Sequence, residues 1–133
     1  MSSLSDLYYR RNQSEEKIRS NERKIERLKT AKKTMAGIKQ QLRTQKKSVV
    51  RLAEDDGTYG KWTGERKKKT QQYFAETVIG EYTDYISAVD RRHDDICDEI
   101  TRLENEIYSL YGTIGYLTGC INNLLNELET ATN

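Results

Sequence analysis

The sequence contains no proline and only one tryptophan, one phenylalanine and one histidine among its 133 residues. Proline removes an amide donor and clashes inside helices, so its absence favours long uninterrupted helices. Only 35% of the residues are hydrophobic and 33% are charged, which is too little apolar material to fill a broad, multilayer core. We therefore expect one domain without a buried catalytic pocket, and not an enzyme.

Long apolar runs are also missing. No run approaches the roughly 18 residues of a membrane-spanning helix, so we expect no membrane insertion. The opening residues lack an apolar stretch followed by small residues, and no secretory signal peptide is expected. Cys97 and Cys120 lie 23 residues apart in one predicted helix, or roughly 35 Å, which is too far for a disulfide within the chain. We expect reduced thiols in a protein made in the cytosol.

One cluster of acidic residues, threonine and glycine, EDDGTYGKWTG at about 54–64, interrupts the helical pattern. Such a cluster predicts a loop. The sequence therefore predicts a single domain over 1–133, with helix one at about 4–53 and helix two at about 65–130. Ser3 and Asp6 have the spacing of a capping-box-like pair that opens helix one.

Helix two has a heptad seam sustained for seven heptads, in which only His93 is neither apolar nor aromatic. A seam of this length is typical of coiled-coil packing. Its two rows are Tyr82, Val89, Ile96, Leu103, Leu110, Leu117 and Leu124, and Ile86, His93, Ile100, Ile107, Ile114, Ile121 and Leu128.

Helix one has a weaker seam. Its upstream part is interrupted by Arg11, Ser14 and Asn21. The downstream part shifts register, and its predicted members are Leu28, Ala31, Met35, Ile38, Leu42, Gln45, Val49 and Leu52.

The two halves of the chain carry opposite charge. Residues 1–69 contain 20 Lys and Arg against nine Asp and Glu, whereas residues 70–133 contain three against 12. Halves of this kind neutralise each other when they pack together. The sequence therefore predicts an all-α fold, an elongated antiparallel two-helix hairpin that resembles a coiled coil, with the second helix longer than the first.

The predicted hairpin leaves the end of helix two without a facing helix. If the loop is the apex, residue 4 lies opposite about residue 115, and the segment 115–130 projects beyond helix one. Unpaired apolar rows of this size usually mark an interface. We expect this segment to bind a partner chain, with self-association as an alternative, through Leu117, Ile121, Leu124 and Leu128.

Three glycines lie within eight residues of helix two, at Gly112, Gly115 and Gly119, and none is in the seam. A glycine inside a helix costs about 1 kcal/mol relative to alanine. Small residues let another backbone approach, and the neighbouring Tyr108 and Tyr111 offer large contact area. This pattern predicts a second helix-binding face.

Two other functions are less favoured by the sequence. His93 and Cys97 lie one helical turn apart, but a two-helix hairpin offers no pocket for converging ligands, so no metal or cofactor is expected. Arg10-Arg11 and the basic run 66–69 are typical of phosphate binding. No base-reading motif accompanies them, and a basic-helix nucleic-acid binder remains the weaker alternative.

Trp62-Thr63-Gly64 between two helices resembles the turn of the W-x-G hairpins exported by type VII secretion. More specifically, DEITRLENEIYSLYGTIGYLTGCINN at 98–123, SLSDLYYRRNQ at 3–13 and RLKTAKK at 27–33 are similar to the YwqH-like family of small helical proteins encoded beside LXG-domain toxins in Gram-positive bacteria.

This resemblance implies a targeting factor or chaperone that binds the helical N-terminal LXG domain of a toxin for export by type VIIb secretion. It also implies that Trp62 and Gly64 form the turn motif. The Y-x-x-x-[DE] export signal of W-x-G substrates is absent after Tyr82, Tyr85, Tyr108, Tyr111 and Tyr116. We therefore expect the toxin or a second small helical protein to supply the export signal. The alternative is a self-associating homodimeric scaffold without a toxin client.

Overall fold

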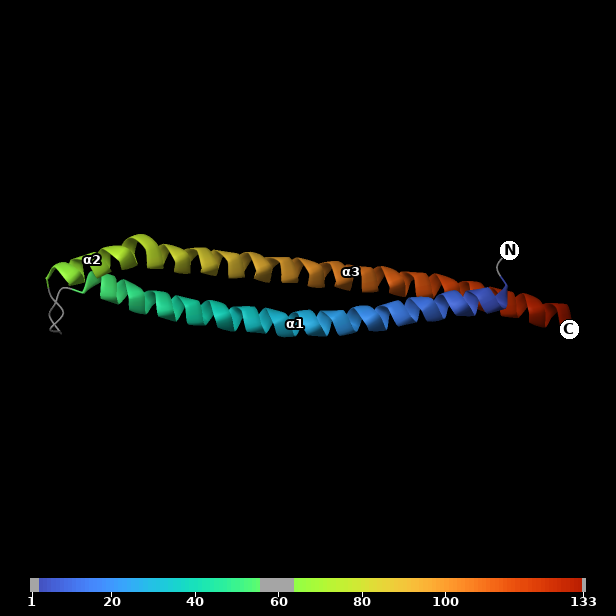
Figure 1. Cartoon of the computed structure of the whole chain (residues 1–133). Helices are drawn as coiled ribbons and strands as arrows, with labels where there is room; N and C mark the ends of the chain where they lie inside the picture. Colours follow the sequence, from blue (N-terminus) through green and yellow to red (C-terminus); the bar gives the residue numbers. More distant parts are fainter. Residues whose placement is uncertain (1–2, 56–63, 133) are drawn as a thin grey trace. The chain divides into compact units, whose positions relative to one another are not determined.

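The computed structural model describes residues 3–55 and 64–132, and its described part is helical nearly throughout. The first arm is helix α1, Leu4–Glu54. The second arm comprises α2, Glu65–Tyr73, the π-helical segment η1, Phe74–Val78, and α3, Ile79–Thr132 (Figure 1). The predicted class, an all-α antiparallel helical hairpin with a longer second arm, is confirmed. Neither described range contains a strand.

Both arms begin at residues suited to start a helix. The backbone N–H of Asp6 donates to Ser3 Oγ at 3.1 Å and that of Ser3 donates to Asp6 Oδ2 at 3.4 Å, which is the predicted capping box. Gly64 precedes α2 with φ 86° and ψ −160°, a backbone conformation open essentially only to glycine. A side chain at position 64 would strain the entry into the second arm.

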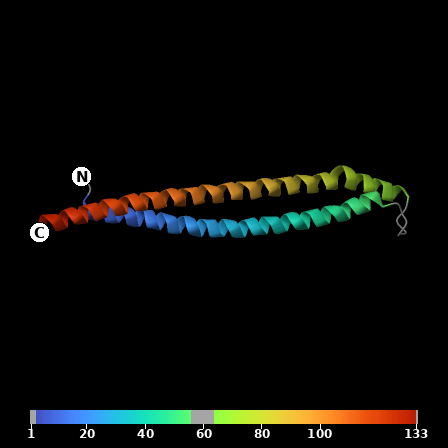
Figure 2. The same ribbon diagram turned by 180° about the vertical axis from the view of Figure 1, so that it is seen from behind.

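The chain divides into two compact units. Unit 1 contains Met1–Thr30 and Cys97–Asn133, and unit 2 contains Ala31–Ile96. Each unit pairs a stretch of α1 with a stretch of the second arm. Figure 2 shows this pairing from behind. In unit 1 the blue segment lies beside the orange-red one, and in unit 2 the cyan-green segment lies beside the yellow one.

Unit 1 contains all seven of the buried hydrophobic side chains in the described part of the chain. Leu7 of α1 packs with Leu117 and Ile121 of α3, and Leu4, Cys120 and Leu124 cover the edge of this cluster. The others are Ile18, Ile25, Ile100 and Leu103. Every buried α3 residue belongs to the predicted seam of helix two, and every residue of that seam except Leu128 is at least half-buried.

Unit 2 is held together differently, because none of its described apolar side chains is fully buried. The Lys67 ammonium pairs with Asp55 at 3.1 Å, and Lys39 of α1 pairs with Asp90 of α3. Gln71 Nε2 donates to the carbonyls of Leu52 and Asp55 at 3.0 and 2.7 Å. These two bonds tie the second arm to carbonyls at the end of the first arm, where no further turn of helix supplies N–H donors.

The predicted seam of helix one is only partly right in unit 2, where four members are half-buried and three are exposed. The half-buried members are Ala31, Met35, Leu42 and Val49. Ile38 and Leu52 are 38% and 46% exposed, and Gln45 is exposed as well, whereas the next residue along the chain is half-buried in each case. Lys39 and Lys46 thus occupy the inner positions. Long lysine stems cover apolar surface while the ammonium remains in water, which makes this rotation tolerable.

Candidate partner-binding surface

The tyrosines and glycines of α3 in unit 1 form one exposed face. We define this tyrosine–glycine face by Tyr108, Tyr111, Gly112, Gly115, Tyr116 and Gly119. Tyr108 is 82% exposed and Tyr116 69% exposed. A Cβ built on any of these three glycines meets nothing within 4 Å. The face therefore has large aromatic contacts beside backbone that a second helix is able to approach closely.

Neighbouring side chains hold parts of this face in place. A hydrogen bond with Cys120 and the negative charge of the Cys120 thiolate raise the pKa of the Tyr116 phenol above its usual value. Tyr111 lines a groove of about 250 Å³ with Ile18 and Ile114. On the facing helix, Arg11 lies 5.1 Å from the centre of the Tyr8 ring and donates to Thr118 Oγ1 at 3.4 Å.

The expected overhang was too long, and two predicted partner-binding residues lie in the core instead. Leu117 and Ile121 are only 1% and 2% exposed because Leu7 of the same chain covers them. Leu124 is half-buried at the edge of the cluster. Residue 4 is therefore opposite the region of residue 124 and not of residue 115. The uncovered end is shorter, and in it Leu125 is 40% and Leu128 50% exposed.

The register error originates near the apex, in unit 2. The two cross-helix ion pairs there join Asp55 to Lys67 and Lys39 to Asp90. Between these pairs the second arm uses 23 residues against 16 in α1. The π-helical segment η1 lies in this stretch, and its i→i+5 turn takes up about one residue of this excess. The excess draws the rest of α3 toward the apex, so each residue of α3 faces a later residue of α1 than predicted.

The predicted turn motif is only partly visible. Trp62 lies outside the described residues. Gly64 is described, and its positive φ agrees with the requirement for glycine at the entry of the second arm.

No group of three or more His, Cys, Asp or Glu side chains in the described ranges is able to hold a metal ion. His93, the polar member of the seam, lines a groove of about 240 Å³ with Val89 and Met35. Among the described helices, none has a segment apolar and long enough to cross a bilayer.

Sequence reasoning missed two features. The sequence identifies Asn21 as a polar seam residue, but nothing in it indicates burial to 1% exposure. The second is a basic groove of about 770 Å³ in unit 2. Its signal was present in the sequence, because residues 27–53 contain nine Lys and Arg and no Asp or Glu.

The fold and its exposed faces define a small antiparallel helical-hairpin protein with surfaces suited to helix association. The chain belongs to the YwqH-like family, whose model matches residues 4–126. No curated protein and no solved structure matches the chain.

Proposed function

We propose that this protein is a non-enzymatic targeting factor or chaperone that binds the helical LXG domain of a toxin for export by type VIIb secretion. It is made in the cytosol and joins the toxin there before export. The toxin, or a second small helical protein, supplies the export signal.

The observation that carries this proposal is the incomplete burial of the helix pair. In unit 2 the described aliphatic side chains of the seam are at best half-buried, and Ile38 and Leu52 are exposed. Burying an aliphatic side chain contributes roughly 1.5–3 kcal/mol relative to leaving it exposed. A third and fourth helix would gain this burial, and oligomerisation commonly completes a core that is too small.

The tyrosine–glycine face supports close packing of a partner helix in unit 1. Glycine is less favourable than alanine inside a helix by about 1 kcal/mol, and this cost applies at Gly112, Gly115 and Gly119. Contact with a partner backbone at these positions offsets that cost. The exposed Leu125 and Leu128 at the end of α3 extend the same interaction beyond Leu4.

The test is co-expression with a tagged LXG domain, followed by affinity capture of that domain. We expect the wild-type chain to co-purify and Gly115→Leu to lower the captured amount at least tenfold. Asn12→Leu is the control, because it places a leucine at an exposed position of α1 in unit 1, outside the tyrosine–glycine face. The free Gly115→Leu chain should unfold no more easily than wild type, since leucine favours helix over glycine.

Failure of the wild-type chain to co-purify would contradict the proposal. Equal capture of both leucine variants would instead remove the tyrosine–glycine face from the interface. The second candidate, a homodimeric scaffold, is favoured by the same uncovered seam. It requires a cooperative dimer in sedimentation equilibrium that ignores the LXG domain.

A further inference from the structure

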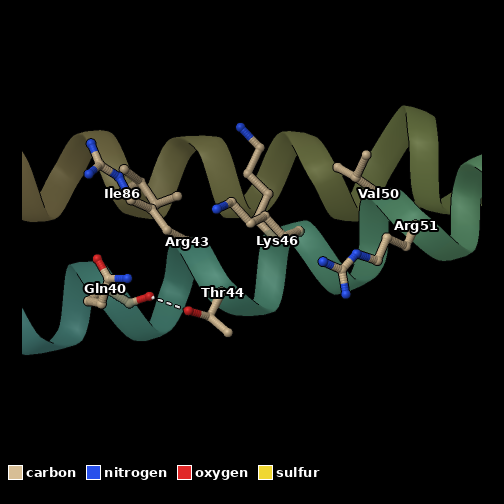
Figure 3. A pocket seen from close by; sticks show the side chains of 8 residues that line it. Gln40, Arg43, Thr44, Lys46, Val50, Arg51 and Ile86 are labelled. Carbon is tan, nitrogen blue, oxygen red and sulfur yellow. Dashed lines mark hydrogen bonds between the residues drawn. The ribbon is translucent and has the colours of Figure 1, made fainter.

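The groove in unit 2 is distinct from the tyrosine–glycine face, which belongs to unit 1. It lies along α1, with Ile86 contributed by α3 (Figure 3). Four cations line it, Arg43, Lys46, Lys47 and Arg51, and its lining contains no carboxylate. We call it the basic groove.

The cations of the basic groove differ from other cations that face the second arm. Lys17 and Lys39 of α1 each have a carboxylate of that arm as an ion-pair partner. Within the described ranges, no ion pair is formed by the four groove cations. Of the four, Arg43 has an electrostatic effect on Asp90. The hydrogen bond from Lys39 is the main cause of the lowered pKa of Asp90, and the charge of Arg43 lowers it further. Four like charges in one groove repel one another, and a bound anionic partner would neutralise this repulsion.

The apolar part of the groove indicates what kind of anion fits. Val50 and Ile86 are half-buried between the basic side chains. Arg43 and Arg51 are eight residues apart, or about 12 Å along the helix. That is the length of two turns of an opposing helix, on which carboxylates spaced by three or four residues flank one aliphatic side chain.

We propose that the basic groove binds an acidic amphipathic helix of another protein. One aliphatic side chain packs on Val50 and Ile86, and the flanking carboxylates pair with Arg43, Lys46, Lys47 and Arg51. Nucleic acid is less suited to this site. Phosphates gain nothing from the apolar residues, and the lining offers no aromatic side chain on which bases stack.

The test uses a fluorescein-labelled synthetic helical peptide that carries four glutamates around two leucines, titrated with the full-length protein at low salt. The comparison peptide has glutamine in place of every glutamate. We expect the glutamate peptide to bind at least tenfold more tightly. Arg43→Gln together with Lys47→Gln should weaken its binding about five- to tenfold, because each exposed pair contributes modestly.

Two control variants separate charge from position. Arg23→Gln with Arg27→Gln removes the same charge from α1 in unit 1, where the two arginines lie beside Glu22 and Glu26, and should leave peptide binding unchanged. Val50→Thr keeps the shape but adds a hydroxyl, and should weaken the peptide a few-fold without changing helix content in circular dichroism.

Several results would overturn the proposal. If the glutamate and glutamine peptides bound equally well, the attraction would not depend on charge pairing. If the unit 1 and unit 2 charge variants lost the same affinity for the glutamate peptide, the attraction would not be specific to the groove. A duplex of twenty base pairs that displaces the peptide and ignores Val50→Thr would assign the groove to nucleic acid. Self-association lost in the Arg43, Lys47 variant would assign it to a second copy. Capture of the LXG domain is measured separately, so the two proposals fail independently.

Discussion

Asn21 is the least satisfied side chain in the described part of the molecule. It is 1% exposed and lies between Ile18 and Ile25 along the seam, and neither Nδ2 nor Oδ1 has a hydrogen-bond partner in the structure. A buried amide without partners costs free energy that an apolar residue of similar shape does not. A buried asparagine in a seam is often retained because it specifies the register.

We therefore predict that Asn21→Leu stabilises the isolated protein by about 1–2 kcal/mol. Leucine has the same branched shape as asparagine and removes the unsatisfied donors and acceptor. Thermal unfolding followed by circular dichroism measures the effect. Asn12→Leu, at an exposed position of α1, controls for the change in helix propensity and should give a much smaller shift. A lower unfolding midpoint for Asn21→Leu would mean that the amide has a polar partner in solution.

At the scale of the elements, sequence reasoning succeeded where the apolar pattern was uninterrupted. Thirteen of the 14 predicted seam residues of the second arm are at least half-buried, since a continuous stripe leaves a helix only one favourable face. The residues of α1 in unit 2 offered a choice between Ile38 and Lys39. The structure places Lys39 inside, because its ammonium reaches Asp90.

The register between α1 and α3 could not be predicted from the sequence for another reason. It depends on how many residues the second arm uses near the apex, and the π-helical segment Phe74–Val78 has no recognisable sequence signal. Leu117 and Ile121 consequently moved from the predicted interface to the core, while Gly112, Gly115 and Gly119 are exposed as expected.

The Lys39–Asp90 pair predicts a pH dependence of unit 2. The hydrogen bond from Lys39 lowers the pKa of Asp90 below its usual value, and the charges of Lys39, Arg43 and His93 add to this effect. A carboxyl with a lowered pKa in the folded state stabilises the fold above its unfolded pKa of about 3.9. That stabilisation is lost as the pH falls through the folded value.

We accordingly expect the unfolding midpoint of the wild type to fall more between about pH 6 and about pH 3 than that of Asp90→Asn. The two midpoints should converge at the acidic end. Asp84→Asn removes an exposed carboxylate from the same helix and serves as the matched control. An Asp90→Asn profile parallel to that of wild type would show that the ion pair does not hold α1 against α3.

At the scale of the whole molecule, the two units differ in how much of their apolar surface they cover. Unit 1 contains a core built on Leu7, Leu103, Leu117 and Ile121, whereas unit 2 relies on ion pairs and half-buried side chains. The Lys39–Asp90 pair is partly exposed, and exposed ion pairs contribute at most about 1 kcal/mol each. Unit 2 should therefore open locally more often than unit 1.

Amide hydrogen exchange of the free chain and of its complex with the LXG domain tests most directly whether a partner completes the helix pair. We predict that peptides from 31–53 and 79–96 exchange much faster than those around Ile25 and Leu103 in the free protein, and become strongly protected in the complex. Equal protection of both units in a free monomer, unchanged when the LXG domain is added, would contradict the account.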